Sequence, residues 1–374
     1  MELDIYQMAN LALDESTPPH VLHELSKRPE ELILVNLASN ISTPEETLLV
    51  LYRSHPSLVN VIAGNKSCPN QLLLEIAKSA TSMTAMEKIC ENPSATNALL
   101  LRLAGSGILR VQELVARNES INSEIIDVLL QSGYDPVITA LASNKSLRAV
   151  DFNFIFEGAN LDAVEAIAGN ESCPQDIIYR LHAKKITQAQ LGLSRNKNTP
   201  IDILGELAFS KNETVRFRVA SNTSANRDIL LHLTNDTDIN VRSAAYENPA
   251  FVKCLSDYEI RRIFSGRILA RELFSNNTAL GVDILFDRLA DERGKNALEN
   301  VVDNLKRRGR DYWASLSMEA IDPQRPCGAK KIPLHVLLTK FNLCEVQEAV
   351  AAVTLKRKVD ELPLTPTQRL RTHL

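Results

Sequence analysis

The segment VRFRVASNTS, residues 215–224, decides the fold, because its asparagine recurs along most of the chain. The recurring residues are Asn40, Asn65, Asn92, Asn118, Asn144, Asn170, Asn196, Asn222 and Asn248. Their spacings are 25, 27 and then 26 residues six times, which indicates an internal repeat.

The residues around each asparagine repeat as well. A small residue such as Ala220 stands two positions before the asparagine, until Tyr246 breaks this column. Aliphatic residues three and seven positions before it lie on one helical stripe. After the asparagine come a serine, often a proline and then an aliphatic pair, as in Ile203-Leu204, which is typical of the start of a second helix. Each unit is therefore predicted to be a helix, a tight turn at the asparagine, and a second helix.

A unit of 26 residues cannot bury a hydrophobic face alone, so neighbouring units must stack into a continuous core. We therefore predict an all-α, right-handed helical-repeat solenoid of about ten 26-residue units over residues 1–285. A first copy begins near Asp14, and Asn277 begins a further copy after a slip of three residues.

Three segments carry a resemblance to a known family: Val215-Arg216-x-x-Val219-Ala220-x-Asn222, the related segment from Val241 to Pro249, and Thr199-Pro200 to Leu207-Ala208. They resemble the leucine-rich repeat variant family. It covers roughly residues 8–285 and implies a right-handed superhelix that pairs an α-helix with a short 3₁₀-helix, similar in form to HEAT arrays. The 26-residue period is longer than the family unit, and the cysteine cluster that one family member uses for an iron–sulfur centre is missing. The resemblance therefore implies a binding platform without a cofactor.

Residues 286–374 have lost the repeat pattern and are predicted to be a C-terminal helical region, either a cap on the array or a separate module. We expect a helix over 298–305, a loop over 321–333, a helix over 334–359 and a tail over 362–374 that lacks core material.

Composition excludes several classes of protein. The chain has 374 residues, of which 44% are hydrophobic, yet no run is long enough for a transmembrane helix and the acidic N-terminus does not resemble a secretory signal. The six cysteines form no Cys-x-x-Cys pair, so we expect reduced thiols in a cytoplasmic protein. Residues 1–252 hold 21 basic and 30 acidic side chains, a net charge of −9. Residues 253–374 hold 21 basic and 16 acidic side chains, a net charge of +5.

Most candidate site residues have a structural explanation. The asparagine column is predicted to tie adjacent repeats together at left-handed turns rather than to bind a ligand. Cys68 and Cys173 occupy the same repeat position and are expected to be small buried thiols. His20 and His23 share a helical face, which favours a polar cap over a metal site. No nucleophile, nucleotide or metalloprotease motif is present, so we expect no catalytic, cofactor or metal residue.

The basic residues leave two functions open. Arg216 and Arg242 are expected to pair with Asp236 or Asp238 of adjacent repeats, whereas Lys306, Arg307, Arg308 and Arg310 form a basic run beside Tyr312 and Trp313. Further cations, among them Arg227, Arg262 and Arg267, precede this run. The leading prediction is a non-enzymatic scaffold that binds a protein partner through the solenoid surface or the C-terminal module. The alternative is a nucleic-acid-binding protein that uses the basic C-terminal half, with residues 306–310 neutralising phosphates or an acidic partner.

Overall fold

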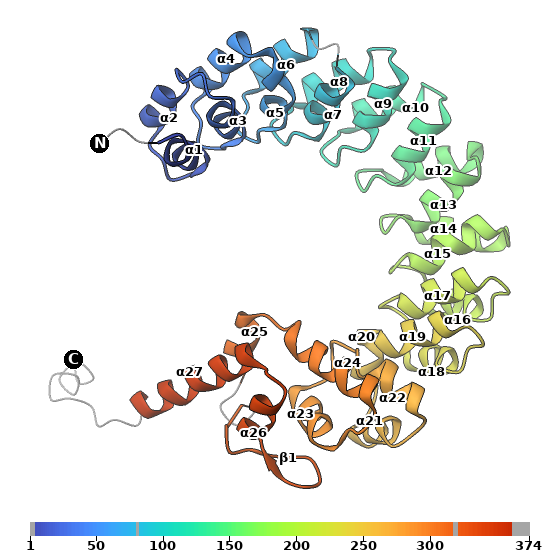
Figure 1. Cartoon of the computed structure of the whole chain (residues 1–374). Helices are drawn as coiled ribbons and strands as arrows, with labels where there is room; N and C mark the ends of the chain where they lie inside the picture. Colours follow the sequence, from blue (N-terminus) through green and yellow to red (C-terminus); the bar gives the residue numbers. More distant parts are fainter. Residues whose placement is uncertain (1–3, 80–81, 317–320, 361–374) are drawn as a thin grey trace, which may run out of the picture. The chain divides into compact units, whose positions relative to one another are not determined.

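The protein is an all-α helical-repeat solenoid, as predicted, in a computed structural model that describes residues 4–79, 82–316 and 321–360 (Figure 1). It divides into two compact units, residues 1–196 and 197–374. The first unit contains helices α1 (Ile5–Leu13), α2 (Pro19–Leu25), α3 (Glu31–Ser39), α4 (Glu45–Ser54), η1 (Pro56–Leu58), α5 (Val59–Gly64), α6 (Asn70–Ser79), α7 (Met83–Glu91), α8 (Asn97–Ala104), α9 (Leu109–Ala116), α10 (Ser123–Leu130), α11 (Asp135–Ala142), α12 (Ala149–Gly158), α13 (Leu161–Gly169), α14 (Gln175–Ala183) and α15 (Thr187–Arg195).

The second unit continues the same alternation of helices and ends in a short hairpin and two helices. Its elements are α16 (Ile201–Leu207), α17 (Glu213–Ser221), α18 (Arg227–Leu233), α19 (Ile239–Glu247), α20 (Pro249–Lys253), α21 (Asp257–Phe264), α22 (Ile268–Phe274), α23 (Val282–Asp291), α24 (Lys295–Lys306), α25 (Arg310–Ala314), β1 (Pro326–Cys327), β2 (Ile332–Pro333), α26 (Leu334–Lys340) and α27 (Cys344–Asp360).

The helices of each unit form layers, because every first helix of a repeat packs on the first helix of the next. In the first unit this layer runs through α1, α3, α5, α7, α9, α11, α13 and α15. In the second unit it runs through α17, α19, α22 and α24. The second helices, such as α8 and α10, pack in the other layer (Figure 1). The aliphatic columns of both helices are buried between the layers, as Val219 and Leu230 illustrate.

The resemblance implied a short 3₁₀-helix in each unit, but in the described part of the chain both helices of the repeats are α-helices, and the 3₁₀ segment is η1, before α5. The predicted turn chemistry is wrong in one respect. The asparagines are not left-handed: Asn170 has φ −79° and ψ 121°, an extended conformation that ends the first helix. The prolines mark the start of the second helices as predicted, since Pro44, Pro174 and Pro200 are their N-caps.

The C-terminal part differs from prediction at two places. The expected loop over 321–333 contains the antiparallel β1–β2 hairpin, in which Cys327 pairs with Ile332. The single helix expected over 334–359 is broken into α26 and α27, because Asn342 adopts a left-handed φ of 52°. The predicted tail over 362–374 lies outside the described residues.

The hairpin and the last two helices pack on the end of the array. The hairpin and α26 contact α23, and α27 contacts α24 and α25. The backbone N–H of Gly328 donates to Asp287 at 2.8 Å, and that of Ala329 donates to Asp291 at 3.0 Å. A Cβ at Gly328 would lie 2.5 Å from Asp291 Oδ1, so only glycine allows this close approach. In the described residues this arrangement covers the last repeat, as a cap would.

Candidate functional site

The asparagine column joins each repeat to the one before it. Asn170 Nδ2 donates to the carbonyls of Ala142 and Asn144, both at 2.9 Å, and its Oδ1 accepts the N–H of Ser172 at 2.8 Å. The same three bonds recur at Asn40, Asn65, Asn92, Asn144 and Asn248. Asn118, Asn196 and Asn222 follow the same pattern. The amide of Asn118 donates to Cys90 O and that of Asn196 to Ala168 O and Asn170 O, and Oδ1 of Asn118 and of Asn222 accepts the N–H two residues later. These side chains are fully engaged within the fold and offer nothing to a ligand.

This geometry explains why the column two positions earlier is small. The carbonyl of that small residue accepts the amide of the next asparagine, so a bulky side chain there would crowd the junction. The serine two positions after the asparagine does not cap the second helix; Ser146 Oγ donates instead to the carbonyl of Glu119 in the preceding repeat. The same bonding occurs at Asn277, the predicted further copy, and continues at Asn304, where the sequence shows no repeat.

Of the two arginines predicted to pair with Asp236 or Asp238, Arg216 forms an ion pair, whereas Arg242 bonds to backbone carbonyls instead. Arg216 binds Asp236 through Nε–Oδ2 at 2.7 Å and Nη2–Oδ1 at 3.0 Å. Burial raises the pKa of Asp236, but hydrogen bonds from Arg216 and from the N–H of Asp238 outweigh it, so the net pKa lies below its usual value. Arg242 donates to the backbone carbonyls of Asp236 and Thr237 at 2.6 and 3.0 Å.

The basic run over residues 306–310 is not one surface. Lys306 and Arg307 are exposed, but Arg308 is only 9% exposed and donates to Leu280 O at 2.7 Å and to the hydroxyl of Tyr312. Burial lowers the pKa of Arg308. Trp313 is fully buried and donates to Arg308 O at 2.8 Å. The side chain of Arg310 lies outside the described residues. Arg308 and Trp313 therefore hold the end of the array together, and the sequence alone did not separate them from exposed neighbours.

The cysteines and histidines that the structure describes are not grouped into a common site. Cys68 and Cys173 are buried, and burial raises the pKa of each thiol to about 12. His23 Nδ1 lies 2.8 Å from Thr47 Oγ1 of the next repeat. Among the described residues no three His, Cys, Asp or Glu side chains are grouped as metal ligands would be. No helix in the described segments is long and apolar enough to cross a bilayer.

A pocket of about 510 Å³ opens in the second unit between α18–α19 and α21–α22. It lies where the asparagine spacing lengthens to 29 residues, from Asn248 to Asn277. This longer segment contains an additional short helix, α20, which begins at Pro249 directly after Asn248 and packs on α18 and α19. The aromatic ring of Tyr246, which replaces the small residue of the column, lines the pocket and lies 6.0 Å from the ring of Phe251.

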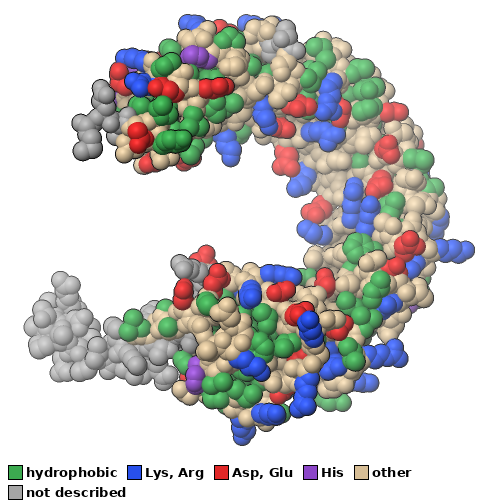
Figure 2. Space-filling model, in the orientation of Figure 1, with side chains coloured by type: hydrophobic (Ala, Val, Ile, Leu, Met, Phe, Trp, Pro, Cys, Tyr) green, Lys and Arg blue, Asp and Glu red, His purple; other side chains and the backbone are tan. Residues whose placement is uncertain are grey.

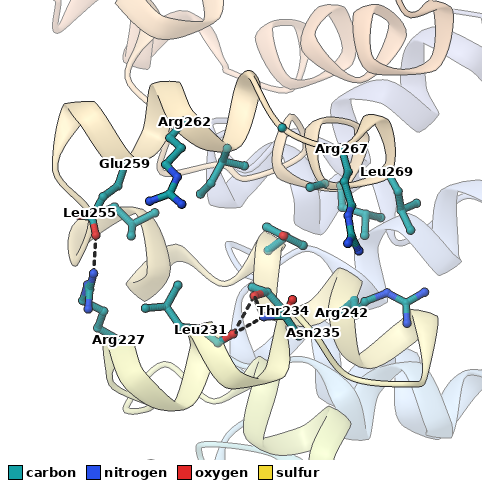
Figure 3. A pocket seen from close by; sticks show the side chains of 15 residues that line it. Arg227, Leu231, Thr234, Asn235, Arg242, Leu255, Glu259, Arg262, Arg267 and Leu269 are labelled. Carbon is teal, nitrogen blue, oxygen red and sulfur yellow. Dashed lines mark hydrogen bonds and ion pairs between the residues drawn. The ribbon is translucent and has the colours of Figure 1, made fainter.

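The pocket is lined by more cations than anions. Arg227, Arg242, Arg262 and Arg267 line it, with Glu259 as its one lining carboxylate. Glu259 pairs with Arg227 and caps α21 through the N–H of Ser256 at 2.9 Å. These bonds, the Ser256 backbone bond foremost, lower the pKa of Glu259 to about 2. Figure 3 shows Arg262 and Arg267 pointing from α21 and the start of α22 into the space above Leu231 and Arg242.

Arg262 and Arg267 are exposed and form no ion pair with a carboxylate in the part of the chain that the structure describes. Burial raises the pKa of Tyr246, while a hydrogen bond with Thr234 and the nearby Arg242 and Arg267 oppose this effect. The surrounding unit, residues 197–374, holds 27 basic and 23 acidic residues, a balance of +4. Lys and Arg side chains are frequent on its visible surface (Figure 2). The site is therefore suited to an anionic group.

All four arginines were candidates from the sequence, but the sequence did not predict that they line one pocket. Two features of the sequence coincide with the pocket. Tyr246 interrupts the column of small residues, and the spacing to the next asparagine is three residues longer than in most other repeats. No family model matches the chain, and a search of curated proteins finds no similar one.

Proposed function

We propose that the protein is a non-enzymatic scaffold that binds a partner protein through the pocket between α18–α19 and α21–α22. The observation that carries the proposal is this pocket, where Arg262 and Arg267 face open space without a carboxylate partner. The recurring asparagines and Arg216, by contrast, bond within the fold, as the contacts of Asn170 and Asp236 show. Unpaired cations on an open surface give a partner electrostatic complementarity.

The pocket is too open to favour a small metabolite. Its rim residues Asn235, Gly266, Arg267 and Leu269 are exposed, whereas sites for small ligands usually enclose most of the ligand. A side chain projecting from the surface of another protein fits an open pocket better. We also propose a cytoplasmic location and a relation to leucine-rich repeat variant proteins, as the sequence predicts. The location is supported by the six cysteines, none of which forms a disulfide.

The test is an affinity capture from native lysate with nuclease, in which two charge-reversed variants are compared. Arg262→Glu with Arg267→Glu reverses the pocket, and Lys306→Glu with Arg307→Glu reverses the exposed part of the basic run. We expect one stoichiometric protein partner to survive nuclease and the second variant, and to be lost with the first. Capture of nucleic acid, abolished by the Lys306 and Arg307 substitutions, would contradict the proposal and support nucleic-acid binding instead.

A further inference from the structure

The chemistry of the pocket limits what part of a partner can occupy it. This step rests on the proposed function and deepens it. Of the five charged lining residues, Arg227 and Glu259 neutralise one another, and Arg242 is held by two neutral backbone carbonyls. Three positive charges, on Arg242, Arg262 and Arg267, therefore remain to be balanced by an occupant.

Apolar side chains line the same pocket between these cations. Leu255 and Ile263 are half-buried there, and Leu269 is 42% exposed. Next to it Ile268 is 61% exposed. An occupant that covered these side chains would remove apolar surface from water, which favours binding by about 25 cal/mol for each Å² buried. The occupant should therefore carry a bulky apolar group as well as negative charge.

A nucleic-acid backbone does not meet both conditions. Phosphates would pair with the arginines, but sugar and phosphate have no bulky apolar group for Leu255, Ile263 and Leu269. Stacking of bases needs exposed aromatic faces, and Tyr246, the lining aromatic residue, is half-buried against Phe251 and Phe274. The basic run that could have extended a phosphate track is interrupted by buried Arg308.

We infer that the pocket binds a linear acidic peptide segment of the partner, with a Leu, Ile, Met or Phe side chain against Leu255, Ile263 and Leu269. Carboxylates on either side of that residue pair with Arg262 and Arg267, which Figure 3 shows pointing into the pocket from the same side. Guanidinium groups suit this role because they bind carboxylates through two parallel hydrogen bonds.

A random peptide library displayed on phage and selected against the full-length protein tests this inference. We expect the enriched peptides to share a bulky apolar residue flanked by two or more Asp or Glu residues. Selection against Arg262→Glu with Arg267→Glu should lose that motif, while Lys306→Glu with Arg307→Glu should retain it. Enrichment of neutral or basic peptides, of no peptide, or of the same motif by the pocket variant would overturn the inference.

A labelled consensus peptide then gives the affinities. Replacing Arg262 or Arg267 singly by Gln should weaken binding about tenfold each, the effect of losing a charge-assisted hydrogen bond. Replacing the acidic residues of the peptide by Gln, or its apolar residue by Ser, should weaken binding by a similar factor. An oligonucleotide of equal length that competes fully with the peptide would contradict the assignment of a peptide site.

The scaffold proposal and the acidic-peptide inference can be contradicted independently of each other. If the lysate partner is lost with the pocket variant but no acidic motif is selected, the scaffold proposal stands and the peptide class is wrong. If the motif is selected but no protein partner depends on the pocket, the scaffold proposal is wrong.

Discussion

At the scale of single residues, one asparagine performs three tasks in each repeat. Its extended backbone ends the first helix, its Oδ1 closes the turn onto the N–H two residues later, and its Nδ2 reaches two carbonyls of the preceding repeat. These groups are buried, since Asn170 is 5% exposed, so each would be left unpaired without the amide. Only asparagine combines this length, donor pair and acceptor.

Asn170→Ala should therefore destabilise the repeats it joins by about 2–4 kcal/mol, since two buried carbonyls lose their donor. Native-state hydrogen exchange of the amides in α13 and α14 measures this local free energy of opening. Asn97→Ala, at an exposed first position of α8, is the control and should change it by less than about 0.5 kcal/mol. Equal effects of the two substitutions would contradict the role of the column.

Asp236 gives a prediction about pH. Its folded pKa lies below the ordinary value of 3.8, so its charged form stabilises the fold fully above that value, and the contribution is lost as pH falls below it. Asp236→Asn should cost about 2 kcal/mol at neutral pH, the effect of a charge-assisted hydrogen bond. In thermal melts, the melting temperature of Asp236→Asn should lie below that of the native protein by an amount that is constant from about pH 8 to 5 and shrinks below about pH 4.

The control for this experiment is Asp228→Asn, whose side chain is 86% exposed. It should change the melting temperature little at any pH. A difference in melting temperature between the native protein and Asp236→Asn that widens on acidification would contradict the prediction. It would show that the charged form of Asp236, paired with Arg216, does not stabilise the fold.

At the scale of helices, the repeats differ in how closely they approach. Helix α15 lies so near α13 that a Cβ at Gly192 would meet Ala168 Cβ at 2.4 Å and Glu165 O at 2.5 Å. These neighbours include backbone, which cannot move aside as a flexible side chain can. Where the spacing lengthens instead, α20 intervenes and the pocket opens before α21. Small changes in spacing and side-chain size therefore decide how closely neighbouring helix pairs pack.

Gly192→Ala should lower the free energy of unfolding by about 1–3 kcal/mol, because α15 must move away from α13. Gly205→Ala is the matched change inside α16, where nothing lies within 4 Å of the new Cβ. That substitution should raise stability by about 0.5–1 kcal/mol through the better helix propensity of alanine. Urea denaturation of both variants checks the pair, and a stabilising Gly192→Ala would refute the close approach.

At the scale of the whole chain, the described contacts join helices that are near in sequence, so each repeat is supported by its immediate neighbours. Such arrays behave as one-dimensional systems, in which a local defect spreads only through the next interfaces. The charge is also divided: residues 1–196 hold 15 basic and 23 acidic residues (−8), against +4 for residues 197–374. Binding of an acidic segment is thereby expected in the second unit.

Hydrogen exchange should reveal this linear organisation. In Asn170→Ala we expect faster exchange from α11 to α15 and unchanged exchange in α1, α2 and α3, several repeats away. Uniform acceleration across residues 4–79 would show instead that the first unit opens as one cooperative body.

The sequence by itself determined the helical repeat, because burial of an aliphatic stripe at helical spacing and a turn asparagine are local requirements that recur in every copy. It also marked the buried thiols and the partners of Arg216. Only the tertiary structure decided which cations are exposed and can contact a partner. Arg308 and Arg307 are adjacent in sequence, yet one is buried against Leu280 and the other is exposed. Arg227 and Arg242 come from α18 and α19, whereas Arg262 and Arg267 come from α21 and the start of α22. They line one pocket because of how these two helix pairs pack, which no single repeat encodes.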